Sequence, residues 1–330
     1  MIVSKTPLRC SFFGGGTDFA GYYENSKYGY GTVLSTALNM YVYIMVCKRF
    51  DKKIRVCYRI QEMVDSVDEV QHNIVREALK IAGITGGIDI VYSADIPMST
   101  SGVGLASSSA FAVGVLNALF AYQGKLVSAD ELARLACEIE IDRLENPIGV
   151  QDQYAVANGG FRQYKFWPTG EVTHTILPGG KGYLHELQEN FLLYYTGMTR
   201  ISSSILSEQE EHIKDRDKTA ILDQMVQMTE AACTELGQGN IGKIGHMLDE
   251  AWQLKKQMAS KISNPEIDEM YNLARESGAI GGKILGAGGG GFMLLYVPRE
   301  SQAQVQAAMK DYRQVEFGFE PEGTRIVFAE

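Results

Sequence analysis

The sequence predicts an α+β fold with two lobes. Strand and helix patterns are mixed along its 330 residues, without the strict βα alternation of a doubly wound sheet. This length exceeds that of one average domain, so two lobes are expected. Turn-rich segments at 158–160 and 178–182 precede a change from mostly strand patterns to mostly helical ones. We therefore expect an N-terminal domain over residues 1–185 and a C-terminal domain over residues 186–330.

The first third should form mainly strands, because β-branched and aromatic residues are concentrated there. The predicted strands are Gly31–Arg49, Lys53–Tyr58 and Ile88–Ile96. Apolar residues with helical spacing predict helices at Asp68–Ile81, Ser108–Tyr122, Ser128–Leu144 and Arg200–Lys214. Ser128 begins a Ser-x-x-Glu capping box. The chain is expected to close with the strand Phe292–Val297, the helix Ser301–Tyr312 and the strand Arg325–Ala329.

Composition excludes several classes of function. A formal charge of -9 lacks the basic footprint of a nucleic-acid-binding protein. Five cysteines without a CxxC pair are typical of free thiols, and five scattered histidines make a histidine-built zinc site improbable. The first residues have too short an apolar run for a signal peptide, and no window approaches 18 apolar residues. We expect a cytoplasmic protein without a membrane or nucleic-acid partner.

A first glycine-bearing segment, Ser101–Phe111 (SGVGLASSSAF), runs from a flexible loop into an apolar helix. Glycines let backbone N–H groups turn toward a ligand, and a helix N-terminus attracts anions. Serines at the helix start offer hydroxyls to phosphate oxygens or to Mg²⁺. The segment therefore fits a phosphate-binding loop, with an ordinary serine N-cap as the alternative. No Walker A lysine is present, because no GK is followed by Ser or Thr.

A second segment, Gly281–Phe292 (GGKILGAGGGGF), matches G-x-G-x-x-G through Gly286, Gly288 and Gly291. It leads into a predicted strand and not a helix, so the context of a dinucleotide fingerprint is missing. An NAD-dependent oxidoreductase is therefore an improbable interpretation. Consecutive glycines instead indicate backbone that passes close to a ligand or to another loop, or a purely structural glycine loop.

Two further segments carry charged residues. In Pro7–Phe19 (PLRCSFFGGGTDF), Arg9 and Asp18 flank a triple glycine, where arginine suits an anion and aspartate suits sugar hydroxyls. A hairpin with surface charges is the alternative. In NPIGVQDQYAVANGG, Asp152 follows a proline–glycine turn and is expected in a loop on constrained backbone. A lone loop aspartate is more often structural than catalytic.

In this order, the segments resemble the GHMP superfamily of small-molecule kinases. Pro7–Asp18 resembles its first motif, Gly104–Ala110 its GLGSSA phosphate loop, and Lys283–Phe292 its third motif. With YTGMTR (Tyr195–Arg200), they are most similar to sugar kinases of the D-glycero-D-manno-heptose type. One departure is the longer Pro97–Gly104 segment, and another is Ala106 in place of the second loop glycine.

The resemblance implies a fold and an activity. The fold is a domain like the second domain of ribosomal protein S5, followed by a ferredoxin-like C-terminal domain. The activity is ATP-dependent phosphorylation of the anomeric hydroxyl of D-glycero-D-manno-heptose 7-phosphate, for nucleotide-activated heptose and surface glycans, with Mg²⁺ as cofactor. Another sugar kinase of the family, acting on fucose or galactose, stays open, as does a non-catalytic sugar and ATP sensor. A homodimer is one option for the assembly.

Site residues follow from matching positions to the family's motifs. Asp152 is the expected base toward the acceptor hydroxyl, and Arg9 is expected beside it. The resemblance assigns ATP binding to Gly102, Gly104, Leu105, Ala106, Ser107, Ser108 and Ser109, and Mg²⁺ binding to Ser108 and Glu140. It assigns substrate binding to Gly16, Thr17, Asp18, Gly288, Gly289 and Gly290. Arg200 and Lys283 are our own candidates for the phosphate already on the substrate.

Overall fold

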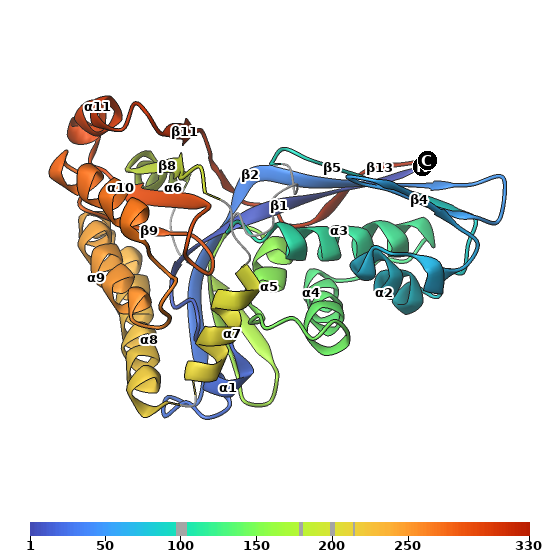
Figure 1. The fold of residues 1–330 in the computed structure, drawn as a ribbon, viewed down its shortest axis with the longest axis horizontal. Helices are drawn as coiled ribbons and strands as arrows, with labels where there is room; N and C mark the ends of the chain where they lie inside the picture. Colours follow the sequence, from blue (N-terminus) through green and yellow to red (C-terminus); the bar gives the residue numbers. More distant parts are fainter. Residues whose placement is uncertain (97–103, 178–180, 199–201, 214) are drawn as a thin grey trace.

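The computed structural model describes residues 1–96, 104–177, 181–198, 202–213 and 215–330, and it contains two β-sheets. Figure 1 shows a long sheet with helices on one of its faces, joined to a second lobe that carries most of the C-terminal helices. In the described residues, the N-terminal half supplies most strands of the long sheet, and helices dominate after residue 202. The mixed α+β character predicted from the sequence is confirmed.

The first sheet is built around two long antiparallel strands, β1 and β2. Its strand order is β13–β1–β2–β5–β3–β4, with β6 and β12 also paired to β2 and with β7 paired to β6. The bounds are β1 (Ile2–Phe13), β2 (Gly31–Lys48), β3 (Ile54–Cys57), β4 (Gln61–Val64), β5 (Ile88–Ala94), β6 (Phe161–Phe166), β7 (Val172–Ile176), β12 (Phe319–Glu320) and β13 (Arg325–Ala329). Only β3 and β5 pair in parallel among these strands.

The second sheet has the order β11–β8–β10–β9 and is antiparallel throughout its described pairs. Its strands are β8 (Phe191–Tyr195), β9 (Gly281–Ile284), β10 (Phe292–Tyr296) and β11 (Arg313–Val315). Helices separate β8 from β9 and β10 from β11, which gives the β-α-β-β-α-β arrangement of a ferredoxin-like unit.

Helices cover the sheets, and α2, α3, α4 and α5 lie on one face of the first sheet (Figure 1). The bounds are α1 (Ala20–Tyr23), α2 (Asn73–Ala82), α3 (Ser107–Tyr122), α4 (Ala129–Cys137), α5 (Gln151–Asn158), α6 (Lys181–Glu189), α7 (Ser202–His212), α8 (Arg216–Gly237), α9 (Ile244–Lys256), α10 (Pro265–Glu276) and α11 (Arg299–Ala308). Short turns are η1 (Val67–Glu69) and η3 (Ile241–Lys243), both 3-10, and η2 (Glu138–Arg143), which is π-helical.

Helix α3 is buried against β1 and β2, as its nearly continuous apolar sequence predicts. Gly114 allows the close approach, because a Cβ atom there would lie 2.9 Å from Thr6 Oγ1. The hydroxyl of Ser4 donates to the Gly114 carbonyl at 2.8 Å. The packing fixes the start of α3, and with it Ser107 and Ser108, relative to the first sheet.

An aromatic cluster joins the two sheets. The ring of Phe12 on β1 lies 5.2 Å from the rings of both Phe161 on β6 and Phe191 on β8, and 6.0 Å from that of Phe319 on β12. Aromatic pairs at such distances stabilise a core beyond the area that they bury. One side chain thus connects the first sheet, the second sheet and the C-terminal segment.

The last strands of the chain return to the first sheet. β13 pairs with β1, with Ile2 opposite Ala329, and β12 pairs with β2. A division at residues 185 and 186 therefore follows chain order, while residues 319–329 complete the first sheet. The domain boundary itself stays a prediction.

Two predicted helices differ in their limits. The helix expected at Asp68–Ile81 begins only at Asn73, because the 3-10 turn η1 ends in extended backbone at Val70. The helix expected at Ser128–Leu144 is α-helical to Cys137 and then continues as η2. Its start is confirmed, since Ser128 Oγ accepts the N–H of Glu131 at 3.2 Å.

We predict that Gly281→Ala destabilises the fold. A Cβ at Gly281 would lie 2.0 Å from the carbonyl oxygen of Gly245, where α9 crosses β9. Overpacking of backbone against backbone should lower the free energy of unfolding by about 2 kcal/mol or more. The control is Gly237→Ala at the end of α8, where nothing lies within 4 Å. Denaturant unfolding should show the control unchanged or stabilised by up to about 1 kcal/mol, and equal curves for both variants would contradict the prediction.

Candidate active site

An ion pair between buried Arg9 on β1 and partly exposed Asp152 on α5 lies at the centre of the site. Arg9 is only 3% exposed. Its Nε donates to Asp152 Oδ1 and its Nη2 to Asp152 Oδ2, each at 2.8 Å. Bidentate guanidinium–carboxylate pairs fix both direction and distance. The alternative of a hairpin with surface charges is wrong, because Arg9 is buried in an interior strand.

Asp152 lies on a helix, which corrects the loop expected from the sequence. It is the second residue of α5, an eight-residue helix that begins at Gln151. The sequence hides this helix because it is short and mixes polar with apolar residues. The first turn of a helix favours a carboxylate through its unpaired N–H groups and its dipole. The Asp152 side chain remains 26% exposed, which leaves it accessible to a ligand.

Arg9 also holds the predicted phosphate loop. Its Nη1 donates to the carbonyl of Gly104 at 2.7 Å, and its backbone N–H donates to the carbonyl of Leu105 at 3.2 Å. Ala106 then adopts a left-handed conformation with φ of 61° immediately before α3. This is the position where the family's loop motif has glycine, and a left-handed alanine costs about 1–2 kcal/mol. The strained residue turns the chain into the helix at Ser107.

The glycine-rich third motif packs against this loop, as the sequence suggested. A Cβ at Gly104 would lie 2.3 Å from the Leu285 carbonyl, and one at Gly286 would lie 2.7 Å from Gly104 Cα. Both glycines have positive φ, 83° and 73°. Two backbones therefore touch without side chains between them, and the second lobe supports the phosphate loop directly.

Gly288, Gly289 and Gly290 do not line the cleft described below. A Cβ at Gly288 would lie 2.6 Å from the Ile262 carbonyl, and the same carbonyl accepts the N–H of Gly289 at 2.6 Å. A Cβ at Gly290 would lie 2.9 Å from the Met198 carbonyl. These three glycines pack against neighbouring loops. In the glycine-rich segment, Gly286 and Ala287 line the cleft instead.

Serines at the start of α3 meet a buried carboxylate from η2. Ser108 Oγ donates to Glu140 Oε1 at 2.5 Å, and Gln153 Nε2 donates to Glu140 Oε2 at 2.7 Å. Burial raises the pKa of Glu140, and these hydrogen bonds oppose the increase. Ser109 is buried, and the buried Oγ of Ser107 has no hydrogen-bond partner in the described part of the chain.

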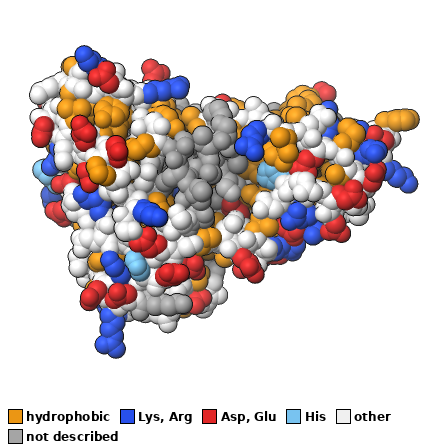
Figure 2. All heavy atoms as spheres, in the orientation of Figure 1, with side chains coloured by type: hydrophobic (Ala, Val, Ile, Leu, Met, Phe, Trp, Pro, Cys, Tyr) orange, Lys and Arg blue, Asp and Glu red, His pale blue; other side chains and the backbone are white. Residues whose placement is uncertain are grey.

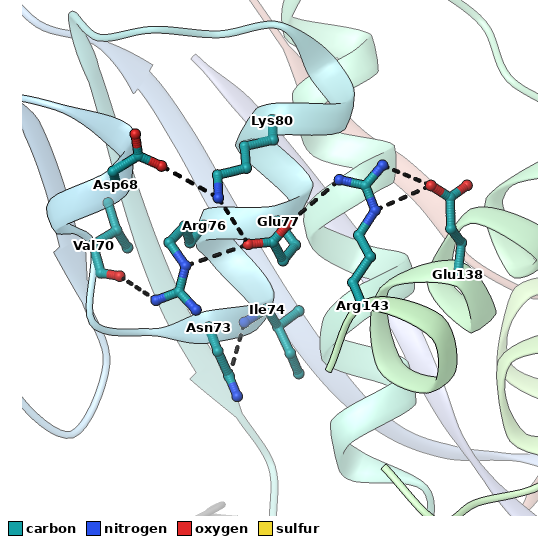
Figure 3. Close-up of polar contacts among 9 residues, drawn as sticks. All are labelled: Asp68, Val70, Asn73, Ile74, Arg76, Glu77, Lys80, Glu138 and Arg143. Atoms are coloured by element: carbon teal, nitrogen blue, oxygen red, sulfur yellow. Dashed lines mark hydrogen bonds and ion pairs between the residues drawn. The ribbon is translucent and has the colours of Figure 1, made fainter. Parts of the chain in front are cut away.

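Ion pairs on the outer side of η2 anchor it to α2 (Figure 3). Arg143 donates to Glu77 at 3.3 Å and to Glu138 at 2.6 Å. Lys80 also donates to Glu77, at 3.1 Å. Although burial opposes it, hydrogen bonding to these cations lowers the pKa of Glu77. The π-helical turn is thus held from outside while Glu140 points inward to Ser108.

Asp18 lies against the loop that leads into α5. It is 2% exposed, and its Oδ1 accepts the N–H of Gly16 at 2.8 Å. Only glycine fits at position 149, because a Cβ there would lie 2.0 Å from Asp18 Oδ2. Burial raises the pKa of Asp18, the Gly16 N–H opposes this, and the charge of Asp152 adds to it.

Thr17 differs from its neighbours in the first motif. Its hydroxyl is fully buried, lies within hydrogen-bond distance of the Gly14 and Thr32 carbonyls at 2.9 and 2.8 Å, and accepts the Thr32 N–H. Thr17 therefore holds the glycine turn together and does not line the cleft. Gly102 and Arg200 lie outside the described residues.

One cleft brings together both predicted catalytic residues and three of the predicted substrate-binding residues. Its lining includes Arg9, Gly16, Asp18, Asp152 and Lys283. It also includes Ser11, Gln209 and Lys255, which the sequence analysis missed. A signal for Lys255 was available, because it lies in helical register with Leu248, Ala251 and Trp252 on the buried face of α9. A lysine at an apolar helical position is unusual unless the charge has a partner or a ligand.

The oxygen atoms near Ser108 suit a Mg²⁺ ion that is bound together with a nucleotide. In the described residues, no group of three or more His, Cys, Asp or Glu side chains could hold a metal by itself. Mg²⁺ bound with a nucleotide needs fewer protein ligands, because it takes most of its oxygens from phosphates and water. A hydroxyl and a carboxylate from Ser108 and Glu140, beside the partnerless hydroxyl of Ser107, match that demand.

Comparison with known families decides the assignment. Residues 69–160 match the model of the GHMP kinases N-terminal domain, and residues 229–314 match that of the GHMP kinases C-terminal domain. The chain is 31% identical to a D-glycero-alpha-D-manno-heptose 7-phosphate kinase of Campylobacter jejuni, over 98% of both chains. This chain belongs to the GHMP kinase family. It is also 25% identical to a galactokinase of Pyrococcus furiosus, over 94% of this chain and 93% of that protein.

Solved structures confirm the two-domain GHMP kinase fold. A D-glycero-D-manno-heptose 1-phosphate kinase from Bacteroides thetaiotaomicron superposes with a TM-score of 0.81 at 23% identity and covers 100% of both chains. A Streptococcus pneumoniae phosphomevalonate kinase superposes with a TM-score of 0.78 at 16% identity, over 97% of this chain and 100% of that one. The GHMP kinase is accordingly an ATP-dependent phosphotransferase that acts on an alcohol group.

Charged side chains of both signs share the visible surface. Figure 2 shows acidic and basic side chains interspersed on the face in view, without an extended basic patch. None of the helices in the described part of the chain combines the length and apolar character that crossing a membrane requires.

We predict that Lys283→Met changes how stability depends on pH. Burial, with the nearby charge of Lys255, lowers the pKa of Lys283 to about 7. The same amine in the unfolded chain titrates near about 10.4, so between these values the unfolded state binds more protons and stability rises with pH. Removing the amine removes this slope. The free energy of unfolding of the variant, relative to that of wild type, should therefore be highest at about pH 6 and lowest at about pH 9.

Denaturant unfolding at several pH values measures this difference. The exposed Lys261, changed to Met, serves as control and should show a difference from wild type that does not change with pH. A Lys283→Met difference that is constant with pH, or one that grows in the opposite direction, would contradict a buried amine of depressed pKa.

Proposed function

We propose that this GHMP kinase phosphorylates the anomeric hydroxyl of a heptose phosphate, D-glycero-D-manno-heptose 7-phosphate. The observation that carries the proposal is the position of Arg9, which pairs with Asp152 and also holds the Gly104 carbonyl of the phosphate loop. A single guanidinium thus connects the acceptor side of the cleft with the nucleotide side.

The residues divide the chemistry between them. Asp152 receives the proton of the attacking hydroxyl, and Arg9 stabilises the charge that develops between acceptor and phosphoryl group. The N–H groups at the start of α3 bind phosphate oxygens, supported by the helix dipole. Mg²⁺, held by Ser108 and Glu140, supplies charge neutralisation on the phosphates when it is bound. Phosphoryl transfer requires mainly such positioning and electrostatic stabilisation.

The choice of acceptor rests on Asp18 and on the similar proteins. Asp18 is a buried carboxylate at the cleft, a group that accepts hydrogen bonds from sugar hydroxyls. The Campylobacter jejuni relative is named for heptose 7-phosphate and aligns over 98% of this chain. A fucokinase or galactokinase activity is the second candidate, because proteins with those names align over 93% and 94% of the chain.

A substrate panel tests the proposed function. Purified protein with ATP and Mg²⁺ is offered heptose 7-phosphate, fucose and galactose, and the position of the new phosphate is read by NMR. We expect the highest kcat/KM with heptose 7-phosphate and a product phosphorylated at the anomeric carbon. Preference for fucose or galactose would select the second candidate, and binding without ATP turnover would favour the sensor.

We predict that Asp152→Asn lowers kcat by about a hundred- to ten-thousandfold, because it removes the proton acceptor but keeps the side-chain shape. Nucleotide affinity should persist, since the proposed ATP site lies on the loop at Ser107 and Ser108. The exposed Asp311, changed to Asn, is the matched control and should retain full activity.

Melting temperature and turnover must be measured on the same preparation of Asp152→Asn. The substitution also weakens the pair with buried Arg9, so some loss of stability is expected in addition. A variant that melts earlier but turns over normally at low temperature would assign Asp152 a structural role and refute the base.

A further inference from the structure

Two buried lysines from the C-terminal half form one wall of the cleft. Lys255 on α9 is 6% exposed and Lys283 on β9 is 7% exposed, and both line the cavity that contains Arg9, Asp18 and Asp152. Their ammonium groups are near enough that the charge of Lys255 contributes to the low pKa of Lys283. Two like charges in one poorly hydrated wall are unfavourable unless an anion joins them.

Hydrogen bonds hold both amines in the wall of the cleft. Lys283 Nζ donates to the carbonyls of Ser11 and Phe12 at 3.0 and 3.2 Å. The partners of Lys255 Nζ include Gln209 Oε1 at 2.8 Å and the Gly15 carbonyl at 3.1 Å. All four acceptors are neutral oxygens. Lys283 Nζ has three donor hydrogens, and its two carbonyl acceptors leave one of them for a further ligand.

The carboxylates of the cleft are engaged elsewhere. Both oxygens of Asp152 accept from Arg9, and Asp18 Oδ1 accepts from the Gly16 N–H. Burial and the charge of Asp152 both raise the pKa of Asp18. Among the described residues, neither carboxylate forms an ion pair with Lys283, which donates only to backbone carbonyls.

A hydroxyl without a partner adds an independent sign of a ligand. Ser11 is 4% exposed and lines the same cleft, and its buried Oγ has no hydrogen-bond partner in the part of the chain that the structure describes. A buried polar atom without a partner costs about 1–3 kcal/mol. An oxygen-rich ligand beside Lys283 would satisfy it.

We propose that Lys255 and Lys283, with Gln209 and Ser11, form an anion subsite for the phosphate monoester that the acceptor already carries. The inference rests on the proposed function, because it assigns the residues that distinguish a phosphorylated sugar from a neutral one. It places Lys255, and not Lys283 alone, at the centre of acceptor recognition. Lys255 also ties this wall to the triple glycine through Gly15 and to α7 through Gln209.

Selectivity between two acceptors provides the first test. The ratio of kcat/KM for heptose 7-phosphate to that for unphosphorylated heptose is measured in wild type and in Lys255→Met. We expect the ratio to fall by about ten- to a hundredfold, because KM for the sugar phosphate rises while KM for ATP stays the same. Lys256→Met, the next residue on α9, is the control and should leave the ratio unchanged. An unchanged ratio in Lys255→Met, or a rise in KM for ATP instead, would overturn the subsite.

A second variant separates recognition from folding. Gln209→Glu keeps the side-chain size and places a carboxylate beside Lys255, where it repels a phosphate. The new ion pair offsets the lost hydrogen bond from Gln209 Nε2 to the Ala287 carbonyl, so the folded protein should persist, which its melting temperature checks. The same selectivity ratio should fall at least about tenfold. A Gln209→Glu enzyme that keeps the wild-type ratio would contradict the proposal even if Lys255→Met fails to fold.

Direct binding of inorganic phosphate makes the subsite testable apart from the reaction. The nucleotide loop is first filled with a non-hydrolysable ATP analogue, and phosphate is then titrated by calorimetry. We expect wild type to bind phosphate and both Lys255→Met and Gln209→Glu to bind it at least about tenfold more weakly. If wild type binds phosphate in this way but phosphorylates no heptose, the proposed function fails and the subsite stands. If wild type binds no phosphate, or all proteins bind it equally, the subsite is refuted whatever the acceptor is.

Discussion

The buried guanidinium of Arg9 is the interaction on which the site depends. Arg9 lies in an interior strand and pairs with Asp152 on α5. Its third hydrogen bond goes to the Gly104 carbonyl in the loop before α3, so the three contacts together fix the orientation of the guanidinium. Three segments that are distant in sequence thereby obtain fixed positions. Replacing this charge with an apolar group would leave a carboxylate and a carbonyl without their donor, so the geometry of the cleft follows from one side chain.

Backbone proximity is the second constraint, and it explains why glycines cluster in this chain. The phosphate loop and the third motif touch through Gly104 and Gly286, and Gly149 makes room for the carboxylate of Asp18. At these places a methyl group would enter occupied space. The glycines therefore bring the two lobes close enough for residues of β1, α5, α9 and β9 to line one cleft.

Local pattern made many of the strands and the buried helix α3 predictable, whereas the roles of Arg9, Asp18 and Asp152 came from the resemblance to the family's motifs. Arg9, Asp18 and Asp152 converge as expected because the motifs mark where the chain must bend or bind. The helix α5 was hidden by its shortness, and the π-helical turn at Glu140 leaves no periodic signal. Ser11 was missed for another reason: its significance arises only when β1 and α9 face the same cavity, which no stretch of sequence records. Lys255 did leave a local signal, a lysine on the apolar face of α9, but the cavity that it lines is likewise visible only in the fold.

The return of β13 to the edge of β1 has a consequence for synthesis on the ribosome. β1 (Ile2–Phe13) is synthesised long before β13 (Arg325–Ala329), yet the two strands are hydrogen-bonded neighbours. Throughout translation the outer edge of β1 is therefore an open template for wrong pairing. Such sequence-distant pairing also slows folding, because a very long loop must close before the contact forms. The first sheet can therefore be completed only after the second lobe has been synthesised.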